Sequence, residues 1–72
     1  MQKIQSPLQA QVVQWLLAPG AAVAAGDVLV ILEAMKMEHE VRAPAAGTVA
    51  TVLAEPGDTL WADQGLLVLA DV

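Results

Sequence analysis

Short apolar runs separated by turn residues recur along the chain, and the two most apolar runs lie at corresponding places in its two halves. Residues 28–32 and 66–69 are rich in branched apolar side chains, a pattern typical of strands buried between two layers. Pro-Gly pairs at residues 19–20 and 56–57 predict tight turns, because proline presets φ and the following glycine accepts a positive φ. Each half therefore predicts a strand, a turn, a short strand, a second turn and a longer strand.

An internal repeat with a separation of 37 residues relates the two halves, because residues 7–32 can be laid over residues 44–69. Eight aligned positions are identical, whereas composition alone would supply roughly two or three, so duplication of one supersecondary unit is the better explanation. The identical pairs are Pro7/Pro44, Val12/Val49, Leu16/Leu53, Pro19/Pro56, Gly20/Gly57, Ala25/Ala62, Leu29/Leu66 and Leu32/Leu69.

A helix is the alternative for the first segment of the repeat. Leu8, Val12 and Leu16 recur at helical spacing, and Ser6 followed by proline resembles an N-cap and first helical position. The aligned segment at residues 47–53 contains a glycine and two threonines, which favour a strand. Since duplicated halves share a conformation, we predict strands at both places.

Two such halves give roughly six to eight short strands, and chains of this kind bury one face of each sheet against the other. We therefore expect an all-β fold: a flattened antiparallel β-barrel or sandwich of two pseudo-twofold-related halves, a barrel-sandwich hybrid, with residues 1–72 as a single domain. The joining segment, residues 33–42, is then expected at one end of the molecule and the chain termini at the other. Trp15 is expected in the core and Trp61 partly exposed.

Composition narrows the classes of function. The 72 residues are 57% hydrophobic and include no cysteine, which excludes disulfides and thiolate metal sites and is compatible with a reducing compartment. Every apolar run is far shorter than the roughly 20 residues of a membrane span, and no segment has the pattern of a signal peptide. A net charge of −5 repels phosphate backbones, so neither a membrane nor a nucleic acid is the expected partner.

Lys36 lies at the midpoint of the repeat, with 35 residues before it and 36 after it, where a hairpin tip is expected. Its neighbours are charged in a chain that is only 15% charged overall. Methionines on both sides of a lysine are unusual for a structural hairpin, which favours Asn-Gly or Asp-Gly. Flexible methionines suit adaptable contacts with a partner, and the lysine amine can reach another protein's active site and become an amide.

The sequence around this lysine, Ala34-Met35-Lys36-Met37, resembles the Ala-Met-Lys-Met attachment signature of the biotinyl domains of biotin carboxyl carrier proteins and biotin-dependent carboxylases. The resemblance covers nearly the whole chain. Residues 43–49 resemble the family's strand after the hairpin. The turns also fall where the family places them, at Ser6-Pro7, Pro19-Gly20, Ala25-Gly26 and Pro56-Gly57-Asp58.

The resemblance implies that a biotin protein ligase joins biotin to Lys36 through an amide. Biotin would then carry carboxyl groups from a biotin carboxylase to a carboxyltransferase, and the expected parent enzyme is an acyl-CoA carboxylase. The domain would be a carrier without its own active site, and its tether would hold the carried group at high effective concentration near both enzymes. The cytoplasm, or the mitochondrial matrix in a eukaryote, is the expected location. Residues expected to be recognised by the ligase or another partner are Glu33, Ala34, Met35, Met37 and Glu38.

Two positions depart from the family's pattern. Ala10 stands where the family commonly has glycine, a change expected to affect the local turn and not the attachment site. Asp63 aligns with Gly26 in the repeat, and aspartate tolerates left-handed backbone better than most residues. The connections in the first half are too short for the protruding thumb of some bacterial carriers, so the likeness is to the thumbless carriers of multidomain acyl-CoA carboxylases.

Three other interpretations stay open. A lipoyl domain of a 2-oxo acid dehydrogenase complex shares the fold and the hairpin lysine, but usually has an acidic residue before that lysine and alanine after it. A non-carrier interaction module would leave Lys36 as an ordinary surface lysine. The glutamates around His39 could form an acid–base or metal site, but a solvated face is the stronger expectation, because one histidine and no cysteine make a poor ligand set.

Overall fold

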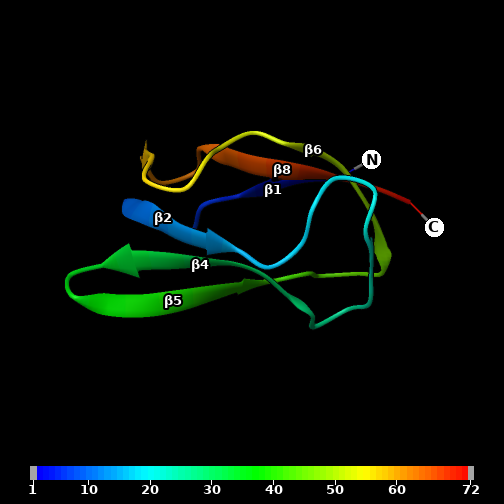
Figure 1. Ribbon diagram of the computed structural model, residues 1–72, viewed down its shortest axis with the longest axis horizontal. Helices are drawn as coiled ribbons and strands as arrows, with labels where there is room; N and C mark the ends of the chain where they lie inside the picture. Colours follow the sequence, from blue (N-terminus) through cyan, green and yellow to red (C-terminus); the bar gives the residue numbers. More distant parts are fainter. Residues whose placement is uncertain (1, 72) are drawn as a thin grey trace.

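The computed structural model describes residues 2–71 as two four-stranded antiparallel sheets (Figure 1). One sheet has the order β1-β8-β6-β3 and the other the order β5-β4-β2-β7. The expected all-β sandwich is confirmed, although the two sheets do not close into a barrel. The strands are β1 (Gln2–Gln5), β2 (Ala10–Trp15), β3 (Ala22–Val23), β4 (Val28–Ala34), β5 (Met37–Arg42), β6 (Gly47–Val52), β7 (Thr59–Leu60) and β8 (Gly65–Ala70).

The helical alternative is wrong, because residues 10–15 form strand β2. Within residues 2–71 no helix is long and apolar enough to cross a membrane. The segment before β2 is ordered by a side chain: buried Ser6 donates its hydroxyl to the backbone oxygen of Leu8 at 2.6 Å. The serine and proline that resembled a helix start thus form a bend between two strands.

The internal repeat is visible in the strand order, since β5 to β8 repeat β1 to β4 at the same separation of 37 residues. Each sheet takes two strands from each half, so the halves exchange strands and neither could form a sheet of this order alone. The hydrogen bonds repeat as well. The amide of Ser6 donates to the oxygen of Gln64 at 2.8 Å, and the amide of Ala43 donates to the oxygen of Asp27 at 2.8 Å.

Irregularities of the sheets also occur in pairs. The register between β2 and β4 shifts between Val12 and Gln14, and the register between β6 and β8 shifts between Val49 and Thr51. A bulge bends its strand and increases the local twist. Because both halves carry the bulge at the same repeat position, both sheets curve in a matched way.

The predicted turn chemistry is confirmed. Gly20 and Gly57 both have φ of 93°, as expected for the glycine of a Pro-Gly turn. Gly26 has φ of 90°, and Asp63, its partner in the repeat, has φ of 68°. Aspartate therefore takes over a left-handed position that the first half gives to glycine. The connections β2–β3 and β6–β7, residues 16–21 and 53–58, are equal in length, so the first half has no inserted thumb.

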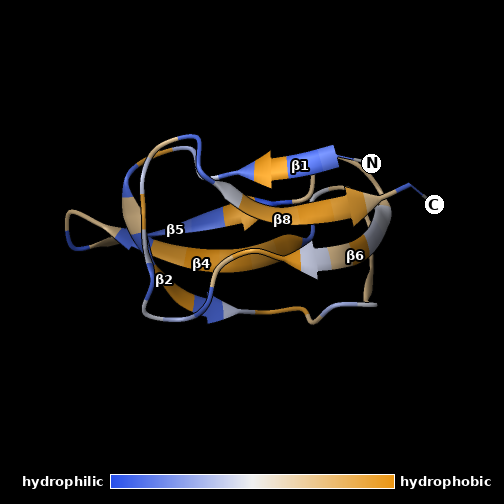
Figure 2. Ribbon diagram, turned by 90° about the horizontal axis from the view of Figure 1, so that it is seen from above, coloured by the Kyte–Doolittle hydropathy of each residue, from blue (hydrophilic) through white to orange (hydrophobic). Residues whose placement is uncertain are grey.

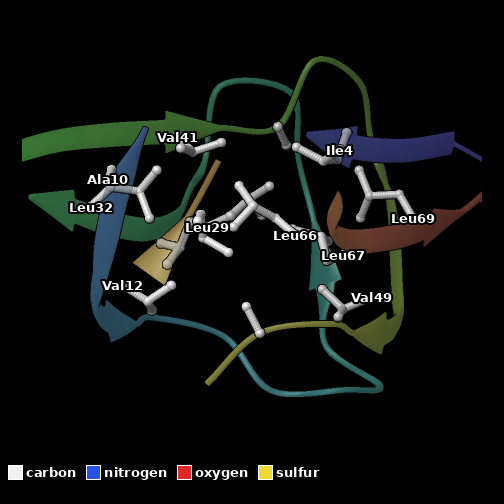
Figure 3. Packing of buried hydrophobic residues seen from close by; sticks show 14 of the residues in the cluster. Ile4, Ala10, Val12, Leu29, Leu32, Val41, Val49, Leu66, Leu67 and Leu69 are labelled. Carbon is white, nitrogen blue, oxygen red and sulfur yellow. The ribbon is translucent and has the colours of Figure 1, made fainter. Parts of the chain in front are cut away.

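The core lies between the two sheets and is made of repeat partners (Figure 3). Leu29 and Leu66, for example, are 1% and 0% exposed. Each fully buried leucine contributes about 1.5–3 kcal/mol to folding. Trp15 is half-buried and packs against this core, and its indole N–H donates to the oxygen of Ala54 at 2.9 Å. Trp61 is 66% exposed, as expected.

The molecule is elongated, with extents of 34 × 17 × 17 Å. The β4–β5 hairpin forms one end, and the start of β1 and the end of β8 lie at the other (Figure 1). Figure 2 shows β4 and β8 as hydrophobic strands, whereas β5 is hydrophilic over the part nearest the hairpin loop. The predicted placement of the joining segment opposite the termini is confirmed.

Candidate functional site

Lys36 occupies the second position of the two-residue loop between β4 and β5. Ala34 and Met37 form the last cross-strand pair below this loop, so Met35 and Lys36 alone make the turn. Lys36 is exposed, and among residues 2–71 its amine has no hydrogen bond or ion pair. The hairpin thus presents one unengaged primary amine at an end of the molecule.

The backbone of this turn is left-handed at both positions. Met35 has φ of 53° and Lys36 has φ of 64°, as a type I′ hairpin turn requires. For residues other than glycine, asparagine or aspartate this conformation costs roughly 1–2 kcal/mol each, and such strain persists where the surroundings over-determine the backbone. Here the paired strands below impose it. Turn geometry alone therefore does not explain these residues, which supports a role in contacting another molecule.

The methionines project from the hairpin and do not fill the core. Met35 is 93% exposed and Met37 is 63% exposed, so both side chains lie at the surface. Ala34, by contrast, is buried at 9% and anchors the base of the loop. Exposed, flexible thioethers on both sides of an amine provide an adaptable apolar surface for a partner.

Two carboxylates lie below the tip. Glu33 and Glu38 are directly opposite each other in the β4–β5 register, and both are exposed. Cross-strand partners have Cβ atoms about 4.5–5.5 Å apart, and like charges there are destabilising. Glu40 differs, because its carboxylate accepts a hydrogen bond from Arg42 at 2.7 Å. Glu33 and Glu38, the two carboxylates nearest Lys36 on this hairpin, therefore have no cationic partner in residues 2–71.

The other charged residues of the hairpin stabilise its base. Arg42 also donates to the backbone oxygen of Gly26 at 2.9 Å, and His39 is half-buried opposite Leu32. Within the described part of the chain, no three histidine, aspartate or glutamate side chains are grouped so that they could hold a metal ion.

A groove beside the hairpin tip was not predicted from the sequence. It has a volume of about 460 Å³ and brings together the start of β2, the end of β4 and β7. Ala10, one of the two positions that depart from the family's pattern, lies in its wall. The lining residues are Leu8, Gln9, Ala10, Gln11, Glu33, Ala34, Met35 and Thr59.

Known proteins resemble the chain over nearly its full length. The family model described as "Biotin-requiring enzyme" matches residues 2–69. The methylcrotonoyl-CoA carboxylase subunit alpha of rice mitochondria is 37% identical over 68 residues, which are 94% of this chain and 9% of that protein. A biotinylated protein TB7.3 homolog from Mycobacterium leprae is 36% identical over 67 residues, 93% of this chain and 94% of that protein.

Solved structures are also similar to the chain over nearly its full length. A single-chain, multi-domain long-chain acyl-CoA carboxylase superposes with a TM-score of 0.93 and 37% identity, over 99% of this chain and 7% of that one. The lipoyl domain of the 2-oxoglutarate dehydrogenase complex from Azotobacter vinelandii gives a TM-score of 0.76 and 29% identity, over 94% of this chain and 96% of that domain. Lipoyl domains are thus related, but the carboxylase is the better fit.

The hairpin geometry and these similarities indicate the same family. Both kinds of relative share the two-sheet fold, but Met35 and Met37 beside the lysine match the attachment signature of the biotinyl branch. The chain belongs to the biotin/lipoyl-attachment family and is a biotin carboxyl carrier domain of the kind found in biotin-dependent carboxylases.

Proposed function

We propose that biotin is attached to the side-chain amine of Lys36, and that this domain carries carboxyl groups without catalysing their transfer. One observation supports the assignment most directly: the amine has no partner among residues 2–71 and stands at a left-handed hairpin tip between two exposed methionines. Attachment replaces one N–H bond of the neutral amine by an amide bond to the activated carboxyl of biotin, with release of the activating group and a proton.

We further propose that a biotin protein ligase recognises the hairpin tip through its flanking side chains. Met35 and Met37 offer apolar contact, and Glu33 and Glu38 offer paired negative charge. Ala34 is too buried for extensive contact and acts by holding the loop on β4. A ligase surface that combines an apolar pocket with basic side chains would complement this tip.

The carrier role follows from the shape of the domain. Biotin supplies a ureido nitrogen on which a carboxyl group can be held. The rigid sheets place its attachment point at the end of a 34 Å long axis, where it can enter an active site before the body of the domain collides with the enzyme. A tethered group samples both active sites at high effective concentration, which suits transfer between a biotin carboxylase and a carboxyltransferase.

The parent assembly is proposed to be a biotin-dependent carboxylase acting on an acyl-CoA. The chain spans 9% of the rice carboxylase subunit and 7% of the long-chain acyl-CoA carboxylase, so the other activities would reside in further domains or subunits. The lack of cysteine is compatible with the reducing cytoplasm or mitochondrial matrix as its location.

The test uses the two lysines of the chain. Lys36 and Lys3 are both exposed, so Lys36→Arg and Lys3→Arg form a matched pair that preserves charge. After coexpression with a biotin protein ligase and biotin, intact mass should show one biotinyl adduct on the unmodified sequence and on Lys3→Arg, and none on Lys36→Arg. A lipoyl adduct on Lys36 would assign the domain to 2-oxo acid dehydrogenase chemistry, and an adduct retained by Lys36→Arg would overturn the site.

A further inference from the structure

The groove beside the hairpin has a lining of mixed polarity. Leu8, Ala10, Ala34 and Met35 provide apolar surface, and Gln9, Gln11, Glu33 and Thr59 provide polar groups. Its volume of about 460 Å³ falls within the range of roughly 300–1,000 Å³ that is usual for small-molecule sites. Met35, which lines it, directly precedes Lys36 in the chain, so the groove lies one residue from the proposed attachment point.

We propose that this groove docks the bicyclic ring of the biotin carried by Lys36 while the arm is not engaged by an enzyme. This inference rests on the proposed function, because it requires biotin on that lysine. The inference goes beyond the proposed function because it assigns to the domain a binding site for its own biotin, formed by β2, β4 and β7 together.

The chemistry of the ring matches the lining. One edge of the bicycle is a saturated sulfur-containing ring, which suits contact with the apolar side chains of Leu8, Ala10 and Met35. The other edge is a cyclic urea with two N–H donors and one carbonyl acceptor. The Glu33 carboxylate, which has no hydrogen bond among residues 2–71, can accept from the urea N–H groups, and the amide of Gln9 can donate to its carbonyl.

Gln11 is already partly engaged, because its side-chain amide donates to the oxygen of Gly57 at 3.2 Å. This bond orders one wall of the groove and leaves the amide oxygen of Gln11 as a further acceptor. A lipoyl dithiolane has no urea and could form none of these hydrogen bonds. The lining therefore favours biotin over the cofactor of the related lipoyl domains.

Because biotin is tethered to the domain, even a low intrinsic affinity of its ring for the groove is enough to keep the groove occupied. A biotinyl-lysine arm is on the order of 14 Å long when extended, since its single bonds are each about 1.5 Å, and so it can fold back onto a groove lined by the neighbouring residue Met35. Short flexible tethers give effective concentrations in the millimolar range. A ring with only millimolar intrinsic affinity would thus occupy the groove for a substantial part of the time, and an enzyme with higher affinity could still withdraw it.

The experiment compares methyl and amide NMR spectra of the biotinylated and unmodified chain. Docking predicts shift changes at Leu8, Ala10 and Thr59, together with nuclear Overhauser contacts between these methyl groups and the biotin ring protons. Leu53 is exposed on another part of the surface and should not shift. Changes confined to residues 34–38 of a fully biotinylated chain would overturn the docking.

A matched pair of variants exploits the repeat. Thr59→Trp places an indole in the groove, and Ala22→Trp makes the same change at the equivalent exposed position, the first residue of β3. Thr59→Trp should lose the shift changes and ring contacts, and Ala22→Trp should keep them, with both variants still biotinylated. Equal spectra for the two variants would overturn the docking. Absence of any biotin adduct on the parent chain would instead overturn the proposed function, and the docking with it.

Discussion

Glu33 and Glu38 face each other across the β4–β5 ladder, one residue pair below the pair that closes the hairpin loop. Neither has a cationic partner within residues 2–71, whereas Glu40 further down the same strand is paired with Arg42. Two like charges in register cost stability. These two charges therefore do not stabilise the hairpin, and the proposed recognition by a ligase would give them a role.

Neutralising one of these carboxylates should change the stability of the fold and the rate of biotinylation in opposite directions. Glu33→Gln removes the repulsion and should stabilise the fold by roughly 0.2–1 kcal/mol at low salt, with a smaller gain at high salt because exposed charges are screened. The same variant should be biotinylated more slowly. Urea unfolding at two salt concentrations and the rate of biotin incorporation measure the two effects.

Glu55→Gln is the control for this pair, because Glu55 is exposed in the turn before β7 and remote from the hairpin register. It should leave the biotinylation rate unchanged. A slower rate in this control would point to overall charge instead of the facing pair, and unchanged stability in Glu33→Gln at low salt would contradict the repulsion.

The left-handed turn gives a second prediction. Met35→Asn replaces a residue strained at φ of 53° by one that tolerates this conformation, and it should stabilise the fold by about 0.5–1 kcal/mol. It also removes a thioether that is 93% exposed, so ligase recognition should weaken. Thermal unfolding and biotinylation kinetics should therefore change in opposite senses. A variant that is both more stable and equally well biotinylated would show that Met35 is not a recognition residue.

A third prediction concerns the close approach of β6 and β8. A Cβ added at Gly47 would lie 2.5 Å from the backbone oxygen of Ala70, whereas one added at Gly65 would lie 3.1 Å from a Leu53 side-chain carbon. The paired backbone at Ala70 cannot move away from an added methyl group, whereas the exposed side chain of Leu53 can. Gly47→Ala should therefore destabilise the fold by about 1–3 kcal/mol, and Gly65→Ala by clearly less. Chemical denaturation of the two variants tests the order, and the reverse order would contradict the packing.

Local features of the fold were readable from the sequence. The Pro-Gly turns, the strand runs and the position of Lys36 at a hairpin tip depend on short-range preferences, namely which dihedrals a residue accepts and which face of a strand is apolar. Asp63 illustrates the point, because its fit to a left-handed position was predicted from its residue type and is observed at φ of 68°. The repeat extended these local inferences to the second half.

Strand partners and the groove were decided by tertiary structure alone. Alternation of apolar residues says which face of a strand is buried, but not which strand lies beside it, so the exchange of strands between halves has no signature in the sequence. The groove joins residues 8–11, 33–35 and 59, which are far apart in the chain, and the pairing of β2 with β7 brings Gln11 and Thr59 together there. The sequence thus determined the hairpin that carries Lys36, because a turn is local, and the assembled sheets determined what lies next to it.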